Sequence, residues 1–234
     1  MLRPSRPTVL LFDIDGTLLL SGGAGRRAID RAFDQAHQRP DATTHFHFGG
    51  MTDPAIIREG LRTIGVEATP SAIDEVLGLY LEYLADELPR STQYQVMPGV
   101  TRLLDQLRAL PGLAVGLGTG NLKKGAFLKL ARGGLDHHFN FGGFACDAED
   151  RAVLVEAGAQ RGRAQLGLAP SEGRVVVIGD TPKDVAAAQA IGALCVGVGT
   201  GGHSPDALRQ CGASFVFEDL SQEGVLEILL SGEV

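Results

Sequence analysis

Two carboxylates follow an apolar segment that is expected to form a buried strand. Asp13 and Asp15 come directly after residues 9–12, and Gly16 provides a turn that ends the strand. Side chains two positions apart lie on the same side of an extended backbone, so both carboxylates face one site. Such a pair favours binding of a divalent cation, or a division of labour between acid and base. The simpler alternative is an ordinary solvated turn, in which Asp and Gly are common.

Two further apolar segments also end in polar residues that are flanked by glycine. Residues 174–178 lead into Asp180 and Asp184, and residues 113–117 lead into the Thr-Gly-Asn sequence at 119–121. In open α/β sheets, ligands bind beyond the carboxyl ends of the parallel strands. The three strand ends are therefore expected to meet at a single site.

The order of the expected elements predicts an α/β fold with two domains. From about residue 100 onward strands and helices alternate, which implies a parallel sheet with right-handed crossovers. Residues 21–95 instead have apolar residues at helical spacing. We therefore expect a catalytic three-layer, Rossmann-like core formed by residues 1–20 and 96–234, and an inserted all-helical cap domain at residues 21–95.

Composition limits the class of protein and of partner. The 234 residues carry a formal net charge of −7 with both signs mixed along the chain, which argues against a nucleic-acid surface. No segment approaches the roughly 20 apolar residues of a membrane span, and no signal peptide is expected. The three cysteines lack C-x-x-C spacing, which favours reduced thiols in a cytoplasmic protein. A monomer and a homodimer are both open.

With these motifs, the chain resembles the haloacid dehalogenase superfamily, and within it the phosphoglycolate-phosphatase-like branch with a helical cap. The motifs that carry the resemblance are Asp13-x-Asp15-Gly16-Thr17, Thr119-Gly120-Asn121 and Gly179-Asp180-Thr181-Pro182-x-Asp184. Any one motif alone is a weak signal, whereas three in the family's order are specific. The resemblance implies a phosphoric monoester hydrolase, with phosphoglycolate as the default substrate of the branch.

The resemblance also assigns roles to the first two strand ends. Asp13 would be the nucleophile that forms an aspartyl-phosphate, which splits one difficult displacement into two easier ones. Asp15 would protonate the leaving alcohol and later activate water. Thr119 would hold the transferring phosphoryl group through its hydroxyl, with Gly120 and Asn121 binding substrate at the start of a helix.

The third strand end would complete a magnesium site. The resemblance implies that Asp180 binds Mg²⁺ together with Asp13 and the carbonyl oxygen of Asp15, and that Asp184 is a ligand or supports the site. Magnesium demands hard oxygen ligands and usually retains water and substrate phosphate.

One family residue is missing from its usual position. The family normally has a lysine before the last acidic strand, and Arg151 stands at about the matching place. A guanidinium can grip a phosphoryl oxygen, although it is not interchangeable with an ammonium. Lys123 and Lys124, at the start of the helix after Thr119, are rival donors, and Lys123 is a candidate for substrate binding.

The expected cap contributes a loop at residues 49–53 as a candidate for substrate selection, with Thr52 and Asp53 as substrate-binding residues. Related sugar-phosphate mutases have an arginine in this loop that grips a second phosphate, and Asp53 stands at that position here. A phosphosugar mutase is thereby disfavoured. Dehalogenation is also disfavoured, because dehalogenases of the superfamily lack the second aspartate, Asp15.

The sequence therefore predicts a magnesium-dependent phosphatase that acts on a small phosphorylated metabolite. Two alternatives stay open beside it. One is a mutase that transfers the phosphoryl group, and the other is a non-catalytic protein that binds a phosphorylated metabolite and lost turnover with the missing lysine.

Overall fold

A computed structural model describes residues 3–231 of the chain. Its strands are β1 (Thr8–Phe12), β2 (Leu19–Leu20), β3 (Gln95–Val96), β4 (Leu113–Gly118), β5 (Gly142–Gly143), β6 (Arg174–Gly179), β7 (Leu194–Val198) and β8 (Phe215–Phe217). Its α-helices are α1 (Ala24–His37), α2 (Asp53–Thr63), α3 (Pro70–Arg90), α4 (Val100–Arg108), α5 (Lys123–Arg132), α6 (Arg151–Gln165), α7 (Pro182–Ala190), α8 (Pro205–Gln210) and α9 (Val225–Ser231).

Six strands form one parallel sheet in the order β5-β4-β1-β6-β7-β8. β1 lies at the centre and pairs with β4 on one side and β6 on the other. All five residues of β1 and all six of β6 are buried, as expected for strands covered on both faces. The predicted parallel α/β core is therefore confirmed, and its three motif-bearing strands are neighbours.

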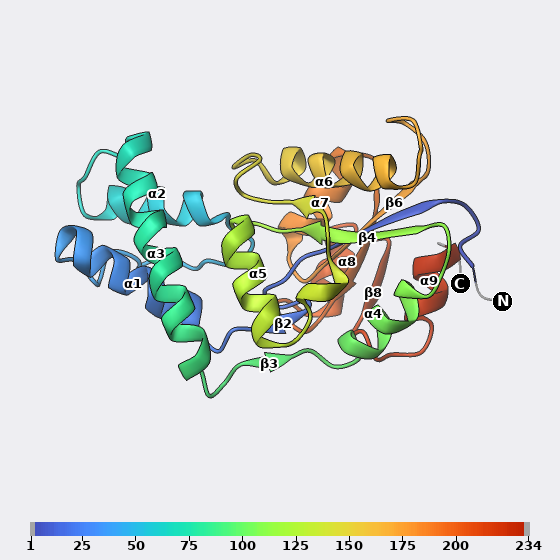
Figure 1. The fold of residues 1–234 in the computed structure, drawn as a ribbon, viewed down its shortest axis with the longest axis horizontal. Coiled ribbons are helices and arrows are strands. Elements are labelled where there is room, and N and C mark those ends of the chain that lie inside the picture. Colours follow the sequence, from blue (N-terminus) through green and yellow to red (C-terminus); the bar gives the residue numbers. More distant parts are fainter. Residues whose placement is uncertain (1–2, 232–234) are drawn as a thin grey trace.

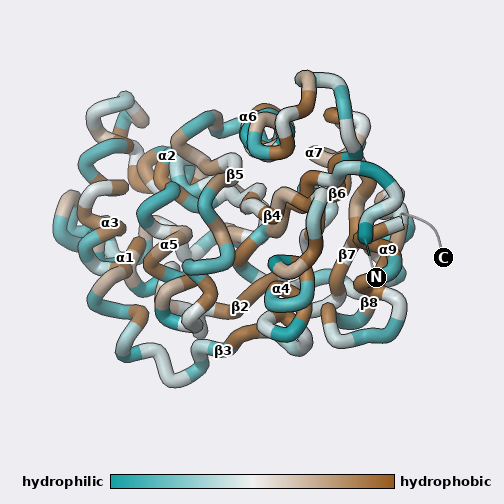
Figure 2. The backbone as a smooth tube through the Cα atoms, turned by 45° about the vertical axis from the view of Figure 1, so that its right-hand side comes forward, coloured by the Kyte–Doolittle hydropathy of each residue, from teal (hydrophilic) through white to brown (hydrophobic). Residues whose placement is uncertain are grey.

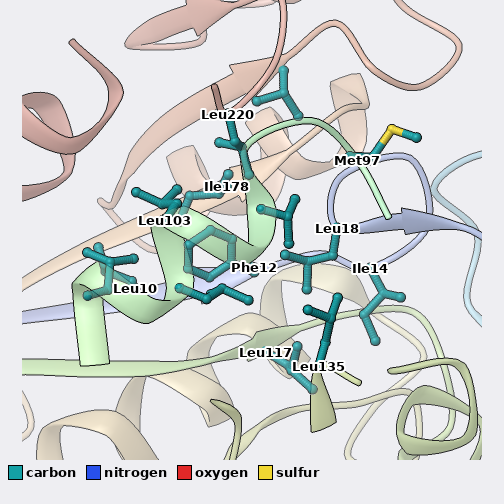
Figure 3. Packing of buried hydrophobic residues seen from close by; sticks show 14 of the residues in the cluster. Leu10, Phe12, Ile14, Leu18, Met97, Leu103, Leu117, Leu135, Ile178 and Leu220 are labelled. Atoms are coloured by element: carbon teal, nitrogen blue, oxygen red, sulfur yellow. The ribbon is translucent and has the colours of Figure 1, made fainter. Parts of the chain in front are cut away.

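Helices cover both faces of this sheet. Alternate β1 residues, Leu10 and Phe12, pack on one face against α4, α5 and α9, whereas Val9 and Leu11 pack on the other against α6, α7 and α8. Figure 3 shows the first of these faces, where Leu103 of α4 and Ile178 of β6 lie beside Phe12. Hydrophobic segments run along the central strands in Figure 2, which is the pattern of a three-layer α/β fold.

Helices α1, α2 and α3 form a separate helical unit, which stands apart from the sheet in Figure 1. They enclose their own apolar cluster, which includes Phe33, Ile57 and Leu84. Sequence signals set their starts: Pro54 lies in the first turn of α2, and the Thr69 hydroxyl caps α3 by accepting from the backbone N–H of Ala72 at 3.2 Å. Whether this unit acts as a cap domain with the bounds 21–95 stays a prediction.

The short antiparallel pair β2–β3 carries the chain into and out of the helical unit. Between β1 and β2 the chain turns sharply at Gly16, whose φ of 89° is costly for other residues, and whose N–H donates to the Leu19 carbonyl at 2.9 Å. This turn places Asp15 between the sheet and the helical unit. Within residues 3–231, no helix is both long and apolar enough to cross a membrane.

Candidate active site

The carboxyl ends of the three central strands bring the motif residues together. Asp13 follows β1, and its backbone N–H donates to the Ile178 carbonyl at 2.9 Å, so it extends the ladder with β6. Thr119 follows β4 and Asp180 follows β6. Because β4, β1 and β6 are adjacent, these three residues meet at one edge of the sheet, as the sequence predicted.

Three carboxylates form a buried group that we call the aspartate cluster: Asp13, Asp180 and Asp184. One oxygen of each lies within 4.8 Å of the others. Burial, together with repulsion from Asp184 and Asp15, raises the pKa of Asp13 to about 6, although Arg151 acts in the opposite direction. Burial and the charges of Asp13 and Asp184 raise the pKa of Asp180 to about 8. The cluster is therefore short of positive charge.

Arg151 is the cation of this cluster. It opens α6, and its Nη2 lies 3.0 Å from Asp13 Oδ2 and 2.5 Å from Asp184 Oδ1, while its Nε donates to the same Asp184 oxygen at 2.9 Å. Only 9% of its side chain is exposed. Burial alone would lower its pKa, but Asp184 and Asp13 raise it above the ordinary value, so the guanidinium stays charged. One planar group thereby bridges two carboxylates, which is the geometry that distinguishes arginine from lysine.

Asp184 uses both oxygens within the protein. Oδ1 contacts Arg151, and Oδ2 accepts from the N–H and the hydroxyl of Thr181 at 3.0 and 2.7 Å, in a capping box at the start of α7. This arrangement orients Arg151. Asp180 is bound less tightly, since one oxygen accepts from the Thr17 hydroxyl at 3.0 Å.

The aspartate cluster fits a divalent cation. Its donors are all hard oxygens, they converge within one coordination sphere, and a single guanidinium leaves their charge uncompensated. Glycines bring two loops close to Asp180, because a Cβ atom at Gly16 or Gly201 would overlap its carboxylate. The residues at hand therefore suit a divalent cation that prefers oxygen ligands, with Asp13 and Asp180 as the freer carboxylates.

The Thr-Gly-Asn motif also lies at this edge of the sheet. Thr119 is fully buried, and its Oγ1 accepts from Asn121 Nδ2 at 2.8 Å. The carbonyl of Gly120 accepts from the backbone N–H of Asp53 at 2.8 Å, so the motif also contacts the helical unit. A Cβ atom at Gly120 would collide with the Met51 carbonyl, which explains why glycine is required at this close approach.

A second group, which we call the lysine network, consists of Lys129, Asn121 and Asp15. Lys129 Nζ lies 2.6 Å from Asp15 Oδ2 and 2.6 Å from Asn121 Oδ1, and Asn121 Nδ2 donates to Asp15 Oδ2 at 2.9 Å. Sequence analysis did not single out Lys129. The signal that could have found it is its place on α5, three and four positions after Ala126 and Gly125 on the buried face of that helix.

A cavity of about 250 Å³ lies between the core and the helical unit. From the core it is lined by Asp13, Asp15, Lys129 and Arg151, among others, and from the helical unit by residues that include Asp53 and Tyr80. Burial raises the pKa of Asp53 to about 6, although the nearby Lys129 opposes the shift. Burial likewise raises the pKa of Tyr80 above its usual range. The two site groups thus open into one small space.

Asp53 is bound to the core rather than free in this cavity. Its Oδ2 accepts from the backbone N–H of Leu122 at 2.7 Å, at the start of α5. Its own N–H donates to the Gly120 carbonyl. The first residue of α2 therefore makes one hydrogen bond to the Thr-Gly-Asn motif and one to Leu122, which follows that motif.

Two of the expected substrate-binding residues do not line this cavity in the described part of the chain. Thr52 is buried, and its hydroxyl has no hydrogen-bond partner within residues 3–231. Lys123 is exposed, with its Nζ 5.9 Å from the centre of the Phe144 ring. Lys124, its neighbour, is also exposed, so Arg151 is the expected donor that the structure brings to Asp13.

The fold and the site define a hydrolase class. The model of the haloacid dehalogenase-like hydrolases matches residues 7–192, and the chain belongs to that family. The superfamily that the motifs resemble is thereby confirmed, and so is the expectation of a hydrolytic enzyme. No curated protein is significantly similar in sequence.

Solved structures share the fold over almost their whole length. A hydrolase from Pseudomonas syringae is 25% identical, with a TM-score of 0.68 and 96% of each chain covered. A predicted phosphoglycolate phosphatase from Haemophilus somnus 129pt is 19% identical, with a TM-score of 0.67 and coverage of 95% of this chain and 97% of that one. CbbY from Rhodobacter sphaeroides, solved with phosphate, is 16% identical, with a TM-score of 0.69 and coverage of 96% and 97%. The likeness to the last two concerns the fold alone.

Proposed function

We propose that this hydrolase is a magnesium-dependent phosphatase of a small phosphorylated metabolite. The observation that carries the proposal is the placement of Asp13 at the end of β1, with Arg151 at 3.0 Å and Asp15 on the same turn, facing one cavity. A nucleophile, a cation for the phosphoryl group and an acid near the leaving oxygen are the parts that phosphoryl transfer through an enzyme carboxylate requires.

The reaction takes place in two displacements. A carboxylate oxygen of Asp13 attacks phosphorus, the bond between phosphorus and the leaving oxygen breaks, and Asp15 gives its proton to that oxygen. Asp15, now a carboxylate, takes a proton from water as the water attacks the aspartyl-phosphate. Inorganic phosphate leaves, and Asp13 and protonated Asp15 are restored.

The remaining residues hold the phosphoryl group. Arg151 faces Asp13 and supplies positive charge where charge accumulates during transfer. The Thr119 hydroxyl accepts from Asn121, so its own proton is available for a phosphoryl oxygen. The backbone around Gly120 and Asn121, at the start of α5, adds N–H donors.

Magnesium would be held by Asp13, Asp180 and the Asp15 carbonyl, with Asp184 supporting the site through Arg151. When bound, the ion supplies positive charge to the phosphoryl oxygens and to the nucleophile. The uncompensated charge of the aspartate cluster supports this part of the proposal.

We further propose that residues 21–95 are a cap that limits the substrate to small molecules. The cavity of about 250 Å³ is bounded by the helical unit, and Asp53 ties the first turn of α2 to the core. Such a lid excludes bulk water from a reactive acyl-phosphate. Thr52 and Lys123 keep the roles expected from the sequence only as proposals, because neither lines this cavity within residues 3–231.

The test is phosphate release from a panel of phosphorylated metabolites, with and without Mg²⁺. Wild type is compared with Asp13→Asn and with the control Asp74→Asn, which changes an exposed aspartate of α3 in the same way. We expect release that depends on metal, is lost in Asp13→Asn and is kept in Asp74→Asn. A phosphorylated protein that hydroxylamine cleaves would identify the acyl-phosphate.

Two outcomes would contradict the proposal. Full hydrolysis by Asp13→Asn would exclude this carboxylate as the nucleophile. An absence of release from every compound, with phosphate compounds still bound by wild type, would favour the non-catalytic binding protein.

A further inference from the structure

Lys129 is a buried cation that the proposed mechanism does not use. Its side chain is 6% exposed, although it reaches the cavity between the core and the helical unit. Burial alone would lower its pKa, but Asp15 and Asp53 raise it above the ordinary value, so the ammonium stays charged. A buried charge is retained only where its partners compensate it, and here the partner at 2.6 Å is Asp15.

Lys129 holds the oxygen of the Asn121 amide. An ammonium has three donors and no acceptor, so the atom of Asn121 that lies 2.6 Å from Nζ is the oxygen. The amide nitrogen then faces the other way, and its two hydrogens go to Asp15 Oδ2 at 2.9 Å and Thr119 Oγ1 at 2.8 Å. Lys129 and the Asp15 carboxylate therefore fix the orientation of Asn121 together.

The two oxygens of Asp15 are thereby made different. Oδ2 accepts from both Lys129 and Asn121, whereas Oδ1 has no hydrogen bond within residues 3–231. A proton on Oδ2 would displace one of the two donors, so a protonated Asp15 carries its hydrogen on Oδ1. The Asp15 side chain is 41% exposed and lines the cavity where the leaving oxygen must sit.

We propose that Lys129 is a positioning residue for Asp15: it holds Oδ2, directly and through Asn121, so that Oδ1 presents the proton to the leaving oxygen. This inference rests on the proposed phosphatase function. The competing explanation is structural, in which Lys129 only neutralises buried carboxylates where α5 meets the helical unit.

Leaving groups distinguish the two explanations. p-Nitrophenolate departs without a proton, whereas an alkoxide needs one, so a defect in the acid appears mainly with alkyl esters. The quantity to compare is kcat/KM, which covers the steps up to departure of the alcohol and omits hydrolysis of the aspartyl-phosphate. The probes are ethyl, phenyl and p-nitrophenyl phosphate.

For Lys129→Met we expect kcat/KM to fall about 100-fold with ethyl phosphate, within the contribution of general acid catalysis, and about threefold with p-nitrophenyl phosphate. Phenyl phosphate, which is close in size to the nitrophenyl ester, should fall between them. Lys129→Arg keeps the charge and the donors and should recover part of the loss with ethyl phosphate. Lys129→Gln keeps a polar group in the buried site and repeats the test if the methionine variant does not fold.

Two further variants complete the experiment. Asp15→Asn shows how kcat/KM depends on the leaving group when the general acid is absent. Arg102→Met is the control in which an exposed cation of the core is replaced by methionine. An equal loss with all three esters, or no loss, in Lys129→Met would overturn the positioning role while the proposed function stands. If Asp15→Asn itself shows no preference for the nitrophenyl ester, the proposed role of Asp15 is wrong and the positioning role fails with it.

Discussion

The aspartate cluster and the lysine network are neighbouring groups of charged side chains that differ in their balance of charge. In the aspartate cluster, one guanidinium contacts two of the three carboxylates, and the pKa values of Asp13 and Asp180 rise to about 6 and about 8. In the lysine network, one ammonium and one amide converge on a single carboxylate oxygen of Asp15. The first group lacks positive charge, whereas the second is nearly compensated.

The difference in charge balance indicates which chemical role each group suits. Carboxylates with uncompensated charge are stabilised by a cation or an electrophile that binds beside them. The aspartate cluster therefore suits binding of a metal ion and of the phosphoryl group. A group whose charges are compensated is stabilised little by a further charge, but its hydrogen bonds keep the side chains in one orientation. The lysine network therefore suits proton transfer by Asp15. Changes to single residues can therefore separate the two groups by the kind of effect they have.

The largest effect is expected from Asp180→Asn in the aspartate cluster. The amide keeps one oxygen but lacks the negative charge of the carboxylate, so hydrolysis should fall by about 100- to 1,000-fold and need more Mg²⁺ for half-saturation. A magnesium titration of phosphate release measures both quantities. Asp206→Asn, on the exposed surface of α8, is the matched control. An unchanged magnesium requirement would show that Asp180 is no ligand and would remove the contrast between the two groups.

Arg151 sharpens the comparison, because it is the only cation within 4 Å of the aspartate cluster in the described chain. Arg151→Met leaves two buried carboxylates uncompensated, and it should lower the free energy of unfolding by about 3 kcal/mol and hydrolysis by about 100-fold. Arg151→Lys restores the charge without the planar bridge, and we expect a loss of about tenfold. Denaturant unfolding and steady-state rates provide the measurements. Faster hydrolysis in Arg151→Lys than in wild type would instead indicate that the arginine restrains turnover.

Asp53 lies on the side of the cavity near the lysine network, and its protonation should make the free energy of unfolding depend on pH. Its pKa is raised from 3.8 to about 6, so the folded protein binds this proton more tightly than the unfolded chain does. Protonation of Asp53 makes its full contribution to the free energy of unfolding below about pH 4, and this contribution is lost as the pH rises through about 6. Asp53→Asn stays neutral, so between pH 4.5 and 7 wild type should lose about 2 kcal/mol relative to the variant. Denaturant unfolding at both pH values measures this difference, and an equal difference at both would contradict the raised pKa.

The smallest effect is expected from a partly exposed ion pair that belongs to neither group. Arg58 of α2 and Glu149 lie 2.7 Å apart, and their side chains are 33% and 41% exposed. Solvent screens such a pair, so Arg58→Ala should change the free energy of unfolding by less than about 1 kcal/mol and leave kcat within about twofold. Thermal unfolding at low and high salt checks this expectation. A larger loss would indicate that closure of the helical unit depends on this contact.

Much of the fold and part of the candidate site could be predicted from sequence, because their signals are local. Short, largely apolar segments of four or five residues identified β1, β4 and β6, and the polar residues that follow each segment lie at one edge of the sheet. The sequence signal was weak for β5, because both of its residues are glycine and give no apolar pattern.

Sequence by itself determined that Asp13, Thr119 and Asp180 meet, because adjacent parallel strands must present their carboxyl ends together. Only the tertiary structure decided which cations lie beside the carboxylates of the site. Arg151 reaches Asp13 and Asp184 at once, and Lys129 reaches Asp15 across 114 positions of sequence. Both cations project from helices, where no local pattern says which buried carboxylate lies opposite. Their partners are set by how α5 and α6 pack, and packing depends on residues far apart in the chain.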